Sequence, residues 1–195
     1  MASLSVRLVG SLLVAFSAGA IAAAPVLAQS DQAALLELTK PGPTHQRLAA
    51  LAGKWVVEGP SGQASQMVKG TAEARTILDG RFLDLEFSVG AGAEMTSARY
   101  TFGFDRRHEH YIVTFLDTYG TYFATGKGRE EAGEIRMAGE DDDPMMKKMG
   151  LRKKFVIGLK VIDAKSFDLN VYWVDTRTPA ENLMLGLAYR FRRPS

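Results

Sequence analysis

In the stretch RFLDLEFSV, residues 81–89, apolar and polar side chains alternate without a break from Leu83 to Val89. Its apolar members share one face and are Leu83, Leu85, Phe87 and Val89. A period of two residues is typical of a strand with one buried and one solvated face, since successive side chains of a strand point to opposite sides. The stretch therefore predicts a strand of an antiparallel sheet.

The same period recurs from Trp55 to the end of the chain. It is clear in SARYTFGFD (97–105), KFVIGLKVID (154–163), SFDLNVYWVD (166–175) and LMLGLAYRF (183–191). It is weaker in KWVVEG (54–59), KGTAEARTIL (69–78), EHYIVTFLD (109–117), YGTYFATGK (119–127) and GEIRMAG (133–139). Turn-forming residues separate these segments, and no helical pattern lies between them. About ten strands in steady succession predict an antiparallel meander.

A long meander leaves two unpaired edges unless it closes on itself. We therefore predict an all-β, up-and-down antiparallel barrel, with a two-sheet sandwich as the alternative. Ahead of the strands, residues 44–53 (THQRLAALAG) predict a short amphipathic helix, with Thr44 as its N-cap and Gly53 as its stop. Leu48 and Leu51 lie on one face of this helix, which should flank or plug one end of the barrel.

The N-terminus has the layout of a secretory signal peptide. One basic residue, Arg7, precedes an uncharged apolar run that ends in Val26-x-Ala28 before Gln29. A membrane anchor is the alternative, since the run is just long enough to span a bilayer. We expect a signal peptide over residues 1–28, a lead-in segment over 29–43 and one barrel domain over 44–195. The mature protein is then expected to be secreted or periplasmic and to lack a membrane span.

Composition narrows the classes of site that the chain can hold. The sequence has no cysteine, which excludes disulfides, thiolate metal sites and thiol nucleophiles. Its formal net charge is +2, and the charges are interspersed except for one acidic run and a basic C-terminus. We therefore expect no nucleic-acid partner, because that role needs a clustered basic face. A domain of this size buries roughly 70% of its unfolded surface, enough for a core without cross-links.

The segment HQRLAALAGKW, residues 45–55, carries a family resemblance. Gly53-x-Trp55 at the start of the first predicted strand resembles the signature of the calycin barrels, the lipocalins and their relatives, in which the tryptophan seals the closed end. Together with DGRFL, FGFD, DDDP and a terminal YRF, it makes the chain similar to the calycin-like domain-of-unknown-function family 1579. The resemblance implies a calycin-like barrel of roughly ten strands and supplies no activity, because one fold hosts many functions.

The residues themselves also favour a sealed barrel end. A large ring at the start of the first strand can cover the core, and a cation from the last strand can stack on it. Arg190, Arg192 and Arg193 are available there, and only Arg193 shares the apolar face of its strand. We predict a barrel-end seal formed by Gly53, Trp55 and Arg193; the alternative is that all three arginines are solvated.

Candidates for metal, haem or catalytic chemistry are few. His108 and His110 fall in a predicted turn beside two arginines, which favours solvated side chains over a metal site. Related calycin barrels, the nitrobindins, bind haem through a histidine of a late strand, and the last strand of this chain has none. Met184 is a remote substitute, since core methionines are far commoner than axial ligands. We expect no cofactor.

Other reactive residues lie in settings that favour structural roles. Segment 140–150 (EDDDPMMKKMG) has three methionines that could attract Cu(I), but it is typical of a flexible loop or a flap. No serine occupies a nucleophile elbow. Asp84 and Glu86 share the polar face of their strand, which indicates a solvated outer wall. We therefore predict no catalytic residue and no metal ligand.

These patterns predict a non-enzymatic barrel that holds a small apolar or amphipathic ligand. The predicted lining residues are Tyr100, Phe102, Phe155 and Trp173. Two alternatives stay open. One is a protein-interaction module with a packed barrel and a functional loop at 140–150, and the other is an enzyme with a carboxylate or tyrosine inside the barrel. The patterns make no prediction of oligomeric state.

Overall fold

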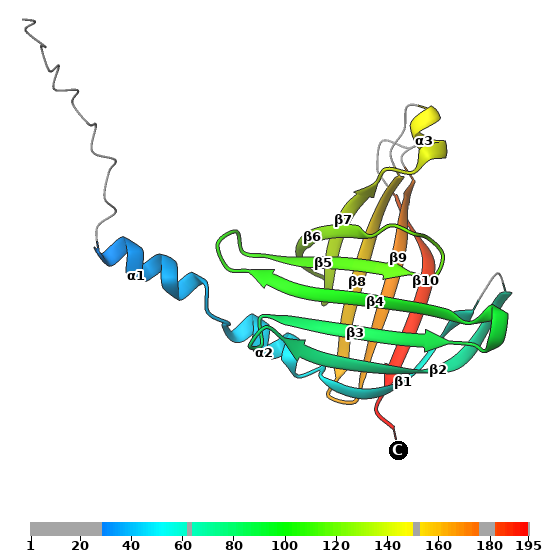
Figure 1. Cartoon of the computed structure of the whole chain (residues 1–195), viewed down its shortest axis with the longest axis horizontal. Helices are drawn as coiled ribbons and strands as arrows, with labels where there is room; N and C mark the ends of the chain where they lie inside the picture. Colours follow the sequence, from blue (N-terminus) through cyan, green and yellow to red (C-terminus); the bar gives the residue numbers. More distant parts are fainter. Residues whose placement is uncertain (1–28, 62–63, 150–152, 176–181, 195) are drawn as a thin grey trace, which may run out of the picture.

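The chain folds into a closed barrel of ten antiparallel strands (Figure 1). The computed structural model describes residues 29–61, 64–149, 153–175 and 182–194. The first five strands are β1 (Gly53–Ser61), β2 (Ala64–Ile77), β3 (Phe82–Val89), β4 (Thr96–Asp105) and β5 (His110–Asp117). The other five are β6 (Ala124–Glu131), β7 (Glu134–Asp141), β8 (Lys153–Asp163), β9 (Ser166–Asp175) and β10 (Asn182–Arg192).

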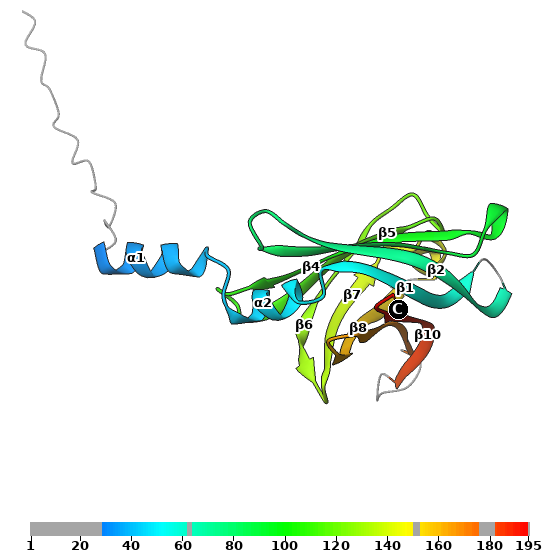
Figure 2. The same cartoon turned by 90° about the horizontal axis from the view of Figure 1, so that it is seen from below.

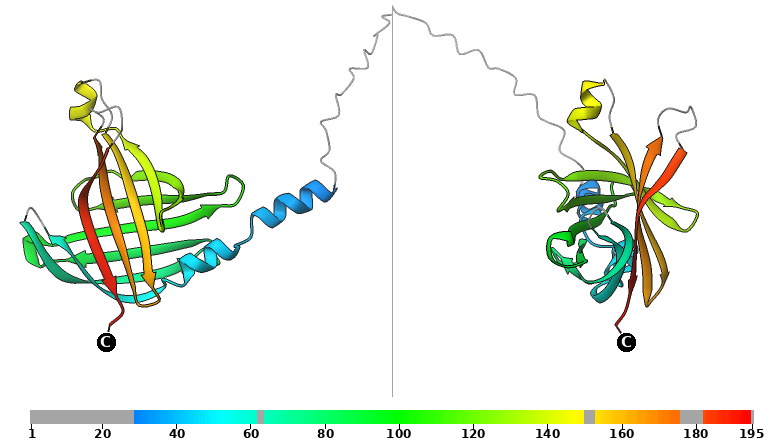
Figure 3. Two further views of the ribbon diagram at one scale, coloured as in Figure 1. Left: turned by 180° about the vertical axis from the view of Figure 1, so that it is seen from behind. Right: turned by 90° about the vertical axis from the view of Figure 1, so that its right-hand side faces the viewer.

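Each strand pairs with its neighbours in sequence, and β1 pairs with β10 to close the sheet. The predicted up-and-down barrel is therefore confirmed, and the sandwich alternative is wrong. Figure 1 and the left view of Figure 3 show that β1 to β5 cross the steeper β7 to β10 at a large angle. Side chains from these two halves of the sheet meet in the interior.

Helices mark the two ends of the barrel. Helix α2 (Pro43–Ala49) lies where β1 begins, and helix α3 (Pro144–Lys148) lies where β7 ends, so we call these the α2 end and the α3 end. Helix α1 (Gln29–Leu38) projects away from the barrel beyond α2 (Figure 2). A short 3-10 helix, η1 (Gly92–Glu94), joins β3 to β4. In the described part of the chain, no helix is long and apolar enough to cross a bilayer.

The start of α2 differs from the prediction. Gly42, not Thr44, is the N-cap, and Pro43 opens the helix, a position that proline favours because its fixed φ suits the first turn. The backbone N–H of Gly42 donates to Nδ1 of His45 at 3.1 Å, so a histidine closes this cap. The predicted signal peptide, residues 1–28, lies outside the described residues.

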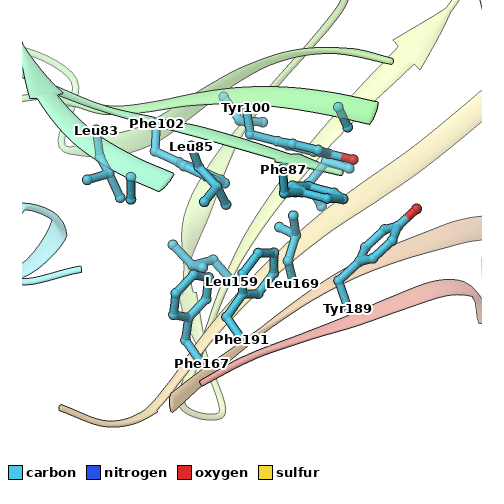
Figure 4. Packing of buried hydrophobic residues seen from close by; sticks show 14 of the residues in the cluster. Leu83, Leu85, Phe87, Tyr100, Phe102, Leu159, Phe167, Leu169, Tyr189 and Phe191 are labelled. Carbon is cyan, nitrogen blue, oxygen red and sulfur yellow. The ribbon is translucent and has the colours of Figure 1, made fainter. Parts of the chain in front are cut away.

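Aromatic rings form a continuous series through the interior (Figure 4). From the α2 end it begins with Trp55 and Phe167, whose ring centroids are 4.8 Å apart. Phe167 stacks on Phe191 at 4.4 Å, and Phe191 contacts Phe87 at 5.4 Å. Contacts of this length are favourable beyond the area that they bury. The series fixes β9, β10 and β3 against one another.

The interval between β5 and β6 is longer than predicted. The segment 119–127 is predicted as a strand, but β6 begins only at Ala124. Tyr119, Tyr122 and Phe123 precede it with exposed side chains. An aromatic-rich run imitates strand composition, so the pattern placed the boundary too early.

Strand β10 also departs from the predicted alternation. The sequence places Leu183, Leu185 and Leu187 on one face, but the pairing with β9 shifts register between Leu185 and Leu187. Leu187 packs against the core, whereas Leu185 is 59% exposed. A β-bulge adds one residue to a strand and so reverses the faces on either side of it.

Part of the predicted 140–150 loop is helical. Asp143 caps α3, because its carboxylate accepts hydrogen bonds from the backbone N–H groups of Met145 at 2.8 Å and Met146 at 3.2 Å. Hydrogen bonds to the ionised carboxylate lower the pKa of Asp143. Met145 and Met149 are exposed.

Candidate functional site

Trp55 lies buried at the α2 end beneath an arginine. Its indole Nε1 donates to the carbonyl of Leu51 at 2.9 Å, which ties β1 to the segment after α2. The guanidinium carbon of Arg193 lies 3.8 Å from the centroid of the Trp55 ring. Nη2 of Arg193 also donates to the carbonyl of Ala52 at 2.9 Å. The arginine is thus held by a cation–π contact and a hydrogen bond together.

Gly53 leaves the space that this arginine occupies. Its φ is +126°, and a Cβ built on it would lie 2.2 Å from Nη1 of Arg193. Any other residue would therefore be strained and would displace the guanidinium. Arg190 instead pairs with Asp168 at 2.9 Å, and Arg192 lies 4.0 Å from Glu58. The structure thus brings Gly53, Trp55 and Arg193 into contact and directs the other two arginines to the outer wall.

The four residues predicted to line a ligand site lie in one aromatic region. Tyr100, Phe102 and Phe155 are each at most 2% exposed, while Trp173 is partly buried. Tyr100 stacks on Phe102 with ring centroids 6.0 Å apart. Phe155 and Trp173 face each other across the β8–β9 pair.

Phe115 links these residues, and sequence reasoning did not single it out. Its ring stacks on Tyr100 at 5.2 Å and meets the edge of Phe155 at 5.3 Å. Phe115 is only partly buried. The alternation of Tyr111, Val113 and Phe115 was a usable signal, since it places all three on the inner face.

Tyr189 is the second residue that sequence reasoning missed. Figure 4 shows the hydroxyl groups of Tyr100 and Tyr189 pointing to the same side, away from Phe102 and Phe167. Both side chains are 2% exposed, yet no hydrogen bond joins either hydroxyl to another described residue. No fully buried side-chain nitrogen or oxygen in the described part of the chain lacks a partner, so both hydroxyls reach accessible space.

Burial is the main cause that raises the pKa of both phenols. The neighbouring phenol of Tyr189 further raises the pKa of Tyr100, and the phenol of Tyr119 further raises the pKa of Tyr189. The Asp117 carboxylate raises the pKa of both Tyr100 and Tyr189. Both tyrosines therefore stay protonated at neutral pH and can donate hydrogen bonds.

Apolar and cationic groups lie further toward the α3 end. Nζ of Lys153 lies 4.5 Å from the centroid of the Trp173 ring. The indole Nε1 of Trp173 lies 2.2 Å from where a Cβ of Gly186 would be, so the ring rests on the bulge of β10. The ring of Tyr189 occupies the corresponding space at Gly59. Glycines in the wall thus let both rings lie close to the sheet.

A groove of about 850 Å³ lies on the outer face of β1 to β5. Short polar side chains border it, including Thr71, Ser88 and Ser97, with Arg99 and Glu86 beside them. This groove is distinct from the aromatic interior that the sequence predicts as the ligand site.

Asp84 was predicted to be a solvated residue of the outer wall, but its side chain is buried. Its side chain is 1% exposed because Arg99 covers it, with Nε donating to Oδ1 at 2.9 Å and Nη2 donating to Oδ2 at 3.0 Å. Thr101 donates to Oδ1 at 3.1 Å. Glu86 remains 46% exposed. The alternation predicts that both carboxylates lie on the outer face, but it cannot predict that Arg99 of the next strand buries one of them.

The histidines have separate surroundings. His108 Nδ1 lies 2.9 Å from Oδ2 of Asp105, and the His108 and His110 rings are 5.7 Å apart. His45 belongs to α2, where its ring is buried 6.1 Å from the ring of Phe104, and burial lowers its pKa. Over the residues that the structure describes, no three His, Cys, Asp or Glu side chains converge as metal ligands.

The fold and this interior define a closed, up-and-down, ten-stranded β-barrel with an aromatic core. The chain belongs to the family described as protein of unknown function DUF1579, whose model matches residues 40–190. The predicted family membership is thereby confirmed. No curated protein matches. A redesigned β-barrel is similar, with 11% identity and a TM-score of 0.36 over 76% of this chain and 95% of that one.

Proposed function

We propose that the protein binds a small apolar or amphipathic ligand inside its barrel, near the α3 end. The observation that carries this proposal is the pair of Tyr100 and Tyr189 hydroxyls. Both rings are buried, both hydroxyls point to the same side, and neither has a protein partner among the described residues. Because neither hydroxyl is engaged by another described residue, both are available to donate to a polar group of a ligand.

The surroundings of the two hydroxyls favour an amphipathic ligand. Phe115, Trp173 and Leu187 are apolar and only partly buried, so they can cover additional apolar surface. A site with mostly aromatic and aliphatic walls and a few polar groups is typical of pockets for small organic molecules. The ligand's acceptor group would lie at the phenols and its apolar part along these three side chains.

The protonation state of the phenols supports binding over catalysis. Burial raises the pKa of both Tyr100 and Tyr189, so neither is a ready general base at neutral pH. A protonated phenol is, however, a good hydrogen-bond donor. The two hydroxyls therefore suit recognition of an acceptor such as a carboxylate or a hydroxyl oxygen.

A second candidate function is a protein-interaction module that uses the rim of the α3 end. Tyr122 and Phe123 before β6 are 54% and 67% exposed, and Met145 on α3 is 67% exposed. Exposed apolar residues of this size favour a partner surface when they gather on neighbouring loops. This candidate needs no ligand in the barrel.

A ligand panel tests the proposal. The full chain should be titrated with a fatty acid, an isoprenoid alcohol and an aromatic acid, with melting temperature and tryptophan fluorescence as readouts. A ligand at about 100 times its Kd should add about 2.7 kcal/mol to the free energy of unfolding. Tyr100→Phe and Tyr189→Phe should each weaken binding about three- to tenfold through one lost hydrogen bond.

Tyr172→Phe is the matched control, because its hydroxyl donates to Glu134 on the outer wall at 3.0 Å. This control should leave affinity unchanged. If no panel member shifts melting and both interior variants are as stable as the parent, the ligand proposal is wrong. The rim would then be the better candidate.

A further inference from the structure

Positive charge gathers on the outer wall where β5, β6 and β7 meet. Arg129 of β6 and Arg136 of β7 are directly paired across the strands, and Lys127 lies two residues before Arg129. With His110 at the start of β5, these side chains border a groove of about 440 Å³. We call it the basic groove. Like charges placed opposite each other destabilise a sheet, so this arrangement costs stability.

The counter-charges near the basic groove are fewer than its cations. Arg136 Nε donates to Oε2 of Glu134 at 2.9 Å, and Glu131 also borders the groove. No ion pair joins Lys127 or Arg129 to any other residue in the described ranges. Lys127, Arg129 and Arg136 against Glu131 and the Glu134 that pairs with Arg136 leave a formal excess of one positive charge along the groove.

Arg136 is held in place by Glu134, which lies two residues before it on β7. Glu134 is buried although it lies on the outer wall, and its Oε1 accepts hydrogen bonds from Asn170 and from Tyr172, both at 3.0 Å. A Cβ on Gly158 would lie 2.3 Å from that oxygen, so the glycine leaves room for the carboxylate. A buried, fully engaged carboxylate therefore orients Arg136 before any ligand arrives.

The floor of the basic groove is apolar. Ala138, Val156 and Leu183 line it. Val156 is 8% exposed although it points outward, and Leu183 faces outward because of the bulge in β10. Cations on one side and aliphatic surface on the other make the basic groove amphipathic.

We propose that the basic groove binds a small phosphate ester. Lys127, Arg129 and Arg136 would hold the phosphate, and the organic group would lie on Val156 and Leu183. Guanidinium groups pair with phosphate oxygens through two parallel hydrogen bonds, and lysine adds a point charge. Lys127 and Arg129, the two groove cations without an ion pair to another described residue, are available to a phosphate monoester. The site is separate from the barrel interior and does not depend on the proposed function.

Calorimetric titration of the full chain with butyl phosphate tests this inference. Butyl phosphate should bind at least about fivefold more tightly than inorganic phosphate, because its chain covers the apolar floor. Arg129→Gln and Lys127→Gln should each lower the affinity for butyl phosphate about tenfold or more, since each removes a hydrogen bond from a charged donor. Both side chains are exposed, so both variants should fold like the parent protein.

Lys165→Gln is the charge-matched control, because Lys165 is an exposed cation in the turn between β8 and β9. It should leave the affinity unchanged, as should Tyr100→Phe, which tests the interior site instead. Val156→Thr makes the floor more polar, so it should reduce the difference in affinity between butyl phosphate and inorganic phosphate.

Three results would overturn the inference: no binding of butyl phosphate, equal affinity for both phosphates, or equal weakening by Lys165→Gln and Arg129→Gln. Vesicles with and without phosphatidic acid identify the source of the ester. Co-sedimentation that needs both phosphatidic acid and Arg129 would assign the groove to a lipid headgroup, which has the same phosphate monoester chemistry.

Discussion

Trp55 and Arg193 show how two residues at opposite ends of the domain fix one end of the barrel. The ring begins β1 and the guanidinium follows β10, so their contact lies beside the strand pair that closes the sheet. The hydrogen bond from Arg193 to Ala52 adds a second link between these chain segments. The closure therefore depends on side chains as well as on the β1–β10 ladder.

Trp55→Ala should lower the free energy of unfolding by about 3–5 kcal/mol, because it removes a buried ring. Arg193→Ala should cost about 1 kcal/mol, as for a partly exposed cation–π contact. A double-mutant cycle measured by urea denaturation should show coupling between the two. Arg192→Ala is the control, and equal coupling of Arg192 with Trp55 would contradict the assigned contact.

Asp84 gives a second prediction at the level of single residues. Asp84→Ala should cost about 2–3 kcal/mol, because it removes a buried carboxylate that accepts three hydrogen bonds. Glu86→Ala, two residues away on the same face, should change stability by less than about 0.5 kcal/mol. Thermal and urea denaturation measure both. Equal losses of stability in Asp84→Ala and Glu86→Ala would show that Asp84 is as solvated as Glu86.

Strand β10 is the element whose local pattern misleads most. Its leucines alternate evenly, yet the bulge reverses the faces before Leu187. Gly186 occupies the bulge, and the Trp173 ring fills the space that a side chain there would need. The bulge thus allows Leu187, Tyr189 and Phe191 to face the core together while Leu183 faces the basic groove.

The bulge predicts unequal effects for two similar leucines. Leu187→Ala should cost about 2 kcal/mol or more, because its side chain packs against the core. Leu185→Ala should cost less than about 0.5 kcal/mol, since Leu185 is 59% exposed. Urea denaturation of both variants decides between the bulged and the regular strand, because a regular strand would make the two losses similar.

For the whole molecule, the buried phenols make stability depend on alkaline pH. Burial raises the pKa of Tyr100 and Tyr189, so the unfolded chain loses these two protons at a lower pH than the folded one. Stability from these groups is intact below about pH 10 and falls as pH rises above it. Each phenol contributes a slope of up to about 1.4 kcal/mol per pH unit there.

The double variant Tyr100→Phe/Tyr189→Phe should therefore lose less stability than the parent between about pH 9 and about pH 11.5. Thermal melting across this range measures the difference in slope. Parallel curves for the double variant and the parent would mean that the two phenols ionise in the folded barrel as freely as in the unfolded chain.

The sequence by itself determined the class of fold, because strand periodicity and turn chemistry are local properties. The alternation around Leu83, Leu85 and Phe87 identified an inner face that the structure retains. The same reasoning by strand phase separated Arg193 from Arg190 and Arg192. Family motifs spread over residues 45–191 indicated the same barrel.

Only the tertiary structure decided which side chains of different strands are in contact, because these contacts depend on strand register and on how closely the strands approach. Arg129 and Arg136 lie seven positions apart in the chain, and only strand pairing places them opposite each other. Phe115 and Tyr189 joined the candidate ligand site because β5 and β10 converge on Tyr100 and Phe87. The bulge at Gly186 and the burial of Asp84 likewise arise from partners on other strands. Periodicity assigns a face to a side chain, but the sheet's register decides which other side chains it meets.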